Sequence, residues 1–113
     1  MKCSTCRKAS KWLDQNNIKY QLRDIVMQPP STDILKLVLE KYSTDKKKIF
    51  NTRGKSFKLL DINIADLSNK EIIQLLSGNG KLIKRPLLVI NQKRFLIGFK
   101  ESDYINFFKI NNN

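Results

Sequence analysis

The sequence of 113 residues contains no histidine and only two cysteines. The absence of histidine excludes acyl transfer by a cysteine–histidine pair. It also removes the strong zinc-site patterns, which need four ligands from cysteine, histidine and carboxylates, so no metal site is expected. Cys3 and Cys6 are too close in the chain for a bond between them to staple distant segments. They either carry chemistry or merely pack where they stand.

Long apolar runs are also lacking. No segment approaches the roughly 20 apolar residues that cross a bilayer, and no apolar signal segment follows the basic start. We therefore predict a protein with no membrane span, located in the cytoplasm, where thiols stay reduced. The length suits one domain, which we place at residues 1–110, with a disordered tail at 111–113.

Acidic residues are few: 10 aspartates and glutamates stand against 22 lysines and arginines, a net charge of +12. Such a charge would indicate a nucleic-acid partner if the basic residues gathered on one face. They are instead spread along the whole chain, which is typical of a solvated surface. Direct nucleic-acid binding is therefore not predicted, although the positive field would attract a small anionic substrate.

Hydrophobic periodicity predicts the elements of the first half of the chain. Helical spacing predicts a helix from the cysteines to about residue 15, and alternation over 18–25 predicts a strand. A second helix is predicted within 28–42, where two prolines precede a capping Ser31 or Thr32. The polar stretch 43–67 is interpreted as an irregular insertion with short helical turns around Gly54.

The second half of the chain predicts a helix, a hairpin and a final helix. Ser68 and Glu71 form a capping-box pattern at the start of a helix within 68–80. Two apolar runs around a polar turn predict a hairpin over 85–99, and helical spacing returns at 101–110. This order is that of an α/β thioredoxin-like fold without its first β-strand.

In a thioredoxin-like sheet a central strand precedes the Cys-x-x-Cys motif, and only Met1 and Lys2 stand before Cys3. That strand would pair with 18–25 on one side and with the hairpin on the other. We therefore predict that the first strand is missing from this chain. As written, the chain should be less stable and more prone to aggregation than a form that begins with an apolar strand, and denaturant melts of both forms test this.

The two cysteines have the spacing of a redox pair. Cysteines three positions apart on the first turn of a helix can come within disulfide distance. Cys3 would lie at the helix N-terminus, where unpaired N–H groups and the helix dipole stabilise a thiolate, and Arg7 adds positive charge. Cys3 is therefore interpreted as the nucleophile and Cys6 as the resolving thiol. The spacing alone leaves open that both cysteines merely pack at a helix start.

Four blocks of the chain resemble the ArsC/Spx family, the glutaredoxin-type arsenate reductases and their relatives, including the redox-responsive regulator Spx. The blocks are "CSTCRKASKWL", "NTRGKSF", "KRPLLV" and "IGFKESDY". The resemblance implies a thioredoxin-like fold with a helical insertion and Cys3 as its redox cysteine. It also implies a cis peptide between Arg85 and Pro86 that faces Cys3, and nearby arginines, Arg85 and Arg53 among them, that hold an oxyanion or glutathione.

The chain departs from the arsenate reductases at the residues that would bind arsenate. Of the three arginines that surround the nucleophile in those enzymes, only Arg85 matches cleanly. Asn51 and Ile97 take the places of the other two, with Arg53 two positions from Asn51. Arsenate is therefore not favoured as a substrate. The second cysteine, Cys6, is a feature of Spx and its close relatives.

Two functions are predicted from these residues. The first is a thiol-disulfide oxidoreductase of the arsenate-reductase-like family, with no bound cofactor, that takes electrons from glutathione, glutaredoxin or a thioredoxin-type partner. The alternative is an Spx-like transcriptional regulator, in which a Cys3–Cys6 disulfide alters binding to RNA polymerase. A monomer is expected in either case.

Overall fold

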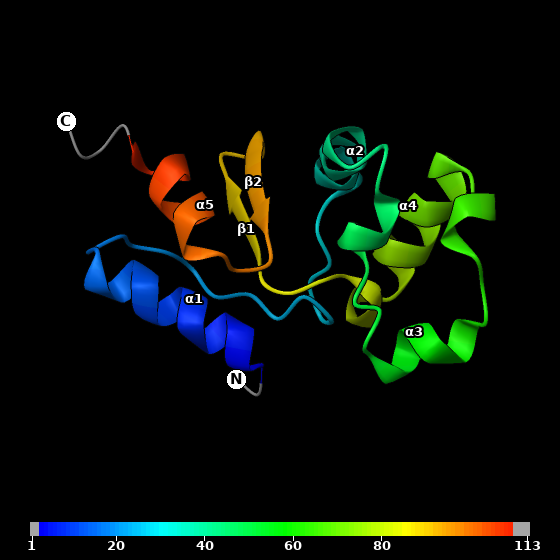
Figure 1. The fold of residues 1–113 in the computed structure, drawn as a ribbon, viewed down its shortest axis with the longest axis horizontal. Helices are drawn as coiled ribbons and strands as arrows, with labels where there is room; N and C mark the ends of the chain where they lie inside the picture. Colours follow the sequence, from blue (N-terminus) through cyan, green and yellow to red (C-terminus); the bar gives the residue numbers. More distant parts are fainter. Residues whose placement is uncertain (1–2, 110–113) are drawn as a thin grey trace.

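A two-stranded antiparallel hairpin stands between two groups of helices (Figure 1). The computed structural model describes residues 3–109. Strand β1 (Leu87–Ile90) pairs with β2 (Arg94–Ile97) in a register that sets Leu87 opposite Ile97. Because side chains alternate between the faces of a strand, the hairpin contributes to a hydrophobic core on each side.

The first core lies between the hairpin and helices α2 (Thr32–Lys41) and α4 (Asn69–Gly78). Leu87 and Val89 of β1 pack against it, and Phe95 of β2 is part of it. The apolar residues that recur at helical spacing on α2 and α4 supply most of the fully buried side chains. Those from α2 and α4 are Ile34, Leu35, Val38, Ile72 and Leu76.

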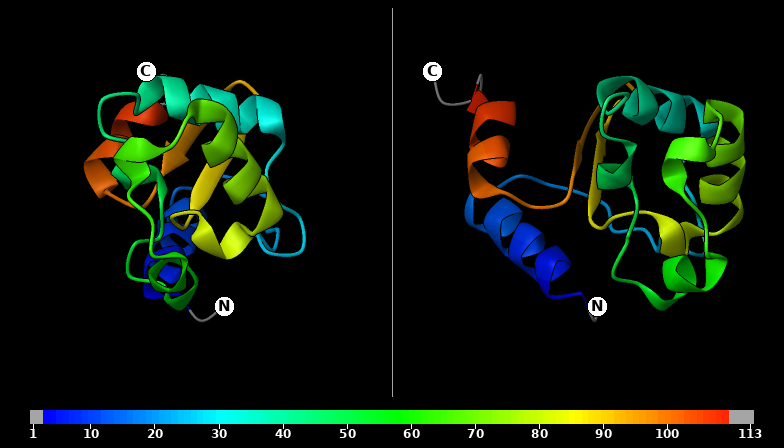
Figure 2. Two further views of the ribbon diagram at one scale, coloured as in Figure 1. Left: turned by 90° about the vertical axis from the view of Figure 1, so that its right-hand side faces the viewer. Right: turned by 45° about the vertical axis from the view of Figure 1, so that its right-hand side comes forward.

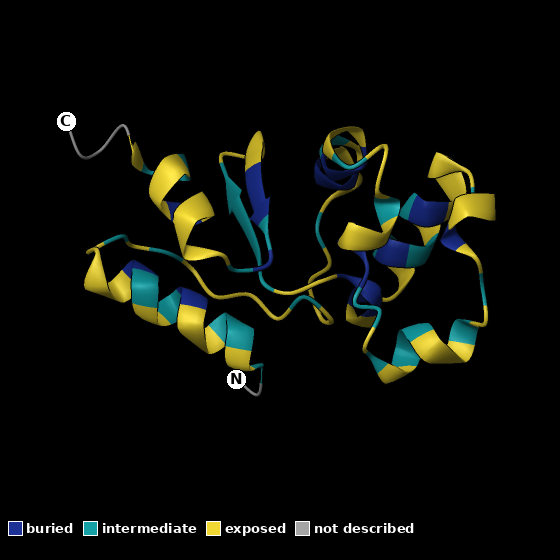
Figure 3. Cartoon of the chain, in the orientation of Figure 1, coloured by how far each residue is buried: buried dark blue, intermediate teal, exposed yellow. Residues whose placement is uncertain are grey.

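The second core lies on the other face of the hairpin, against helices α1 (Ser4–Gln15) and α5 (Glu101–Phe107). Leu96 is buried there, and Leu88 packs beside it. Tyr104 of α5 is only 1% exposed and meets the ring of Trp12 edge to face at 5.5 Å. Figure 3 shows the helices buried toward the hairpin and exposed on their outer sides.

The predicted insertion is irregular and contains short helical turns. It holds the 3₁₀ helices η1 (Lys46–Ile49) and η2 (Ile64–Asp66) on either side of the short helix α3 (Lys55–Leu60). A third 3₁₀ helix, η3 (Gly80–Leu82), follows α4 and leads toward β1. Gly54 occupies the N-cap position of α3, which has no side-chain capping hydrogen bond.

Two local predictions are confirmed, one by its hydrogen bonds and the other by its backbone angles. The Glu71 N–H donates to Ser68 Oγ at 3.1 Å, and the Ser68 N–H donates to Glu71 Oε1 at 2.9 Å, which completes the capping box. In the hairpin turn Asn91 and Gln92 both have positive φ, 53° and 57°. This backbone matches the twist of the flanking strands.

The predicted strand over 18–25 is wrong. Residues 18–24 form neither strand nor helix, and residues 25–27 form a turn. A strand needs a neighbouring strand to bond to, and among residues 3–109 the two strands β1 and β2 pair only with each other. The alternation in the sequence has another cause, because Ile18 and Tyr20 pack against the second core. The predicted tail at 111–113 lies outside the described residues.

At Gly80 the segment that follows α1 contacts the chain of the first core. It is buried, and the backbone of Ile25 lies directly over its Cα, so that a Cβ at this position would overlap the Ile25 carbonyl. Absence of a side chain is therefore what allows the two segments to touch.

Within residues 3–109 no helix has both the length and the apolar character needed to cross a bilayer.

Candidate functional site

Cys3 lies at the N-cap of α1, immediately before the first helical residue. Its extended backbone, φ −78° and ψ 118°, turns the side chain back over the first turn, and its Sγ accepts a hydrogen bond from the Cys6 N–H at 3.3 Å. The sulfur thus takes the place that a serine or aspartate oxygen usually fills at a helix start. No acidic residue stands in the first turn to oppose a thiolate.

Burial raises the pKa of the Cys3 thiol, but other contributions outweigh it and the net pKa lies below its ordinary value. Hydrogen bonds from the Cys6 thiol and from the backbone N–H groups of Cys6 and Thr5 favour the thiolate. The positive charge of Arg85 lowers the pKa further. Cys3 is therefore the more acidic of the two thiols and the one suited to act as a nucleophile.

Cys6 has the opposite character. Burial raises its pKa most, and the hydrogen bond of its thiol to the Cys3 sulfur and the charge on that sulfur add to the effect, giving a pKa of about 12 despite the nearby Arg85. Both cysteines are free thiols and half-buried. The pair therefore consists of one thiol with a lowered pKa and one with a raised pKa.

Arg85 is brought to the cysteines by the chain that enters β1. Its charge lowers the pKa of both Cys3 and Cys6. The peptide between Arg85 and Pro86 is cis. The carbonyl of Pro86 accepts a hydrogen bond from the Gly98 N–H at 2.8 Å, which fixes this segment at the base of the hairpin.

The two other predicted arginines are Arg7, on α1, and Arg53, directly before the N-cap of α3. The Arg7 N–H donates to the Cys3 carbonyl at 3.1 Å, one turn along α1. Arg53 is exposed and stands before the Gly54 cap of α3. Figures 1 and 2 show α3 and the N-terminal end of α1 along one lower edge of the molecule. Anion binding by Arg85, Arg53 and Arg7, and contact between Pro86 and a substrate, stay predictions.

Arg85→Ala should raise the pKa of Cys3, because it removes the cationic charge that favours the thiolate. Arg53→Ala should raise it less. The measurement is the rate of alkylation of Cys3 as a function of pH, which follows the thiolate fraction, in the Cys6→Ser background so that one thiol reacts. Lys36→Ala on α2 is the matched control and should leave the curve in place. An unchanged curve in Arg85→Ala would remove Arg85 from the site.

Tyr104 is a residue that the sequence did not connect with the cysteines. Burial raises the pKa of its hydroxyl, and the charge on Cys6 raises it further, to about 12. Tyr104 packs in the second core with Ala9, which lies on the same face of α1 as Cys6. The helical spacing of residues 101–110 predicted the last helix, but only the packing of α1 on α5 brings Tyr104 near the two cysteines.

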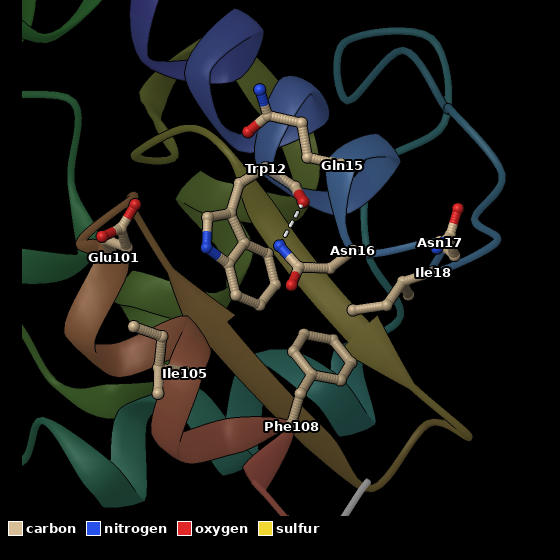
Figure 4. A pocket seen from close by; sticks show the side chains of 8 residues that line it. All are labelled: Trp12, Gln15, Asn16, Asn17, Ile18, Glu101, Ile105 and Phe108. Carbon is tan, nitrogen blue, oxygen red and sulfur yellow. Dashed lines mark hydrogen bonds between the residues drawn. The ribbon is translucent and has the colours of Figure 1, made fainter. Parts of the chain in front are cut away.

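A hollow of about 480 Å³ lies at the other end of α1 (Figure 4). Trp12 and Phe108 form its aromatic wall, with ring centroids 5.8 Å apart. The Asn16 side-chain amide on its rim donates to the Trp12 carbonyl at 2.8 Å and closes the helix end. Neither cysteine lines this hollow, so it is separate from the candidate redox site.

Among residues 3–109 no three cysteines or carboxylates gather as metal ligands.

Known proteins resemble this chain in sequence. The chain is 41% identical over 105 residues to "Uncharacterized protein YusI" of Bacillus subtilis (strain 168), covering 91% of this chain and 88% of that protein. It is 39% identical over 101 residues to "Global transcriptional regulator Spx" of Streptococcus mutans, covering 89% of this chain and 73% of the regulator.

A solved structure gives the same result for the fold. The crystal structure of a possible arsenate reductase from Streptococcus mutans UA159 superposes with a TM-score of 0.82 at 39% identity, covering 91% of this chain and 90% of that one. The fold is therefore the α/β thioredoxin-like fold of these proteins. The family model described as "ArsC family" matches residues 1–107. The chain belongs to the ArsC family.

Proposed function

We propose that this protein is a thiol-disulfide oxidoreductase in which Cys3 is the nucleophile and Cys6 the resolving thiol. The observation that carries the proposal is the contrast between the two sulfurs. Cys3 caps a helix, accepts the Cys6 N–H at 3.3 Å and has a lowered pKa, whereas Cys6 has a pKa of about 12. Such a pair can attack a disulfide through one sulfur and release the product through the other.

The proposed cycle begins when the Cys3 thiolate attacks one sulfur of a substrate disulfide and the other substrate sulfur leaves as a thiolate. The Cys6 thiol then loses its proton to solvent, and its sulfur attacks Cys3 Sγ. This second step forms the Cys3–Cys6 disulfide and releases the remaining substrate thiolate. The substrate gains two electrons, which the cysteine pair supplies.

The oxidised pair would return to the dithiol by exchange with glutathione, glutaredoxin or a thioredoxin-type protein. We propose no bound cofactor, because the two sulfurs carry the electrons themselves. Arg85, which lies where its charge reaches both sulfurs, would hold an anionic group of the reductant or substrate. A cytoplasmic location would keep the pair supplied with reductant, and we expect the enzyme to act as a monomer.

The test is a panel of turnover assays with glutathione as reductant. We expect repeated reduction of a model mixed disulfide, and little or no reduction of arsenate, because Asn51 and Ile97 replace two arginines of the arsenate reductases. Cys3→Ser is the inactive control. Failure of the wild-type protein to turn over any disulfide would overturn the proposal.

A second candidate function is a redox sensor of the Spx type. It is favoured by the Cys-x-x-Cys pair and by the relatives named Spx, one of them 35% identical over 105 residues. In this case the Cys3–Cys6 disulfide would alter binding to RNA polymerase. The two candidates differ in turnover: a sensor switches once, and its reduced and oxidised forms would retain different amounts of RNA polymerase on a column.

A further inference from the structure

The edge of the molecule that carries Cys3 is lined by basic residues from separate segments. Arg7 and Lys11 follow Cys3 at steps of four residues, so they share its side of α1. Helix α3, which contributes Lys55 and Lys58, lies along the same lower edge in Figures 1 and 2. The chain entering β1 adds Arg85, whose charge acts on both sulfurs.

Acidic residues are scarce along this edge. Helix α1 has no acidic residue before Asp14, near its far end, and α3 has none before its C-cap, the exposed Asp61. Asp24 lies on the segment that joins α1 to α2, and its Oδ1 accepts the Val26 N–H at 2.9 Å. Arg23 stands directly before it. The charged residues on the elements around Cys3 are therefore predominantly basic.

We infer that the substrate disulfide of this protein is carried by an acidic peptide segment of another protein. The inference rests on the proposed function and adds the class of substrate to it. A surface of one sign raises the local concentration of oppositely charged partners and speeds their association, typically by about 10- to 1000-fold at low salt. A thiolate in such a surface reacts faster with a disulfide that has aspartates and glutamates around it.

The chemical step is the first exchange of the proposed cycle. The Cys3 thiolate bonds to the sulfur of the acidic segment, and the sulfur previously bonded to that one leaves as a thiolate. Cys6 then releases the acidic segment as a thiolate, with its own proton passing to solvent, and the cysteine pair is oxidised as the substrate is reduced. The basic edge contributes to the encounter and to holding the segment, and it takes no electrons.

The test uses the reduced protein in single turnover with two synthetic peptides of equal length. Each peptide holds one cysteine joined by a disulfide to the same chromophoric thiol, and the cysteine is flanked by aspartates and glutamates in one peptide and by lysines in the other. Stopped-flow absorbance follows release of the chromophore. At low salt we expect the acidic peptide to react about tenfold faster, and at about 0.5 M salt the difference should nearly vanish because the charges are screened.

Matched variants separate a local surface from net charge. Lys11→Glu with Lys55→Glu changes the edge beside Cys3, at one mid-helix lysine and one first-turn lysine, both exposed. Lys36→Glu with Lys70→Glu makes the same change in net charge on α2 and α4, also at exposed positions. The first pair should abolish the preference for the acidic peptide, and the second should retain it.

Each result bears on a different claim. Equal rates for the two peptides, or equal loss of the preference in both double variants, would overturn the acidic substrate and leave the oxidoreductase standing. Absence of chromophore release from either peptide would overturn the proposed function and this inference with it. Release from both peptides, with the acidic one faster and the preference lost only in the Lys11 and Lys55 double variant, would support both.

Discussion

Cys3→Ser is expected to abolish disulfide exchange, whereas Cys6→Ser should leave the first step intact and accumulate a mixed disulfide. The serine hydroxyl at position 3 would still cap α1, so the fold should survive the change. What is lost is the one thiol with a lowered pKa. In Cys6→Ser the substrate stays bonded to Cys3, because no second thiol stands one turn away to displace it.

Intact-mass spectrometry after incubation with a disulfide measures both outcomes. The rates of alkylation of the two thiols by iodoacetamide provide a second test. Cys3 should react at pH values below those at which ordinary thiols react, and Cys6, with a pKa of about 12, should stay nearly unreactive through pH 10. Equal alkylation rates at neutral pH would contradict the assignment of Cys3 as nucleophile.

Gly80→Ala is expected to destabilise the fold by about 2–3 kcal/mol, the upper range for forcing one extra methyl group into a packed interior. A Cβ at Gly80 would overlap the Ile25 carbonyl, and backbone atoms cannot move aside as the end of a flexible side chain can. Either η3 or the turn at 25–27 has to shift, and η3 is part of the first core. The midpoint of denaturant unfolding measures the loss.

Gly78→Ala is the matched control for this prediction. Gly78 is the last residue of α4, it is exposed, and a Cβ there would meet nothing within 4 Å. An alanine at a helical position with free space should be neutral or stabilising by up to about 1 kcal/mol. Equal losses in the two variants would show that the close approach of Gly80 and Ile25 is not what makes position 80 sensitive.

The elements that depend on local residues could be predicted from the sequence. Ser68 and Glu71 cap α4 through bonds that span three residues, and Asn91 and Gln92 turn the hairpin through their own backbone. The prediction of a strand over 18–25 was wrong, because the local alternation of apolar residues does not show whether a neighbouring strand is there to bond to. Ile18 and Tyr20 are placed by packing on a core whose other members come from distant parts of the chain.

In the candidate site, too, the features set by local residues could be predicted, and those set by packing between distant elements could not. The acidity of Cys3 relative to Cys6 was predictable, because it comes from the helix start that both residues occupy. The approach of Arg85 followed from the resemblance of one sequence block. The effect of Cys6 on Tyr104 followed from neither, because it depends on how α5 lies against α1.

The two faces of the hairpin pack against the two cores, so the register of its strands affects the packing of both groups of helices. Leu87 and Val89 face one core while Leu88 faces the other. A slip of β1 by one residue would exchange these faces, so that both groups of helices would meet the wrong side chains at once. The same slip would move Arg85, two residues before β1, relative to the cysteines. The turn at Asn91 and Gln92, at the far end of the hairpin, therefore also helps to hold Arg85 in place near the two cysteines.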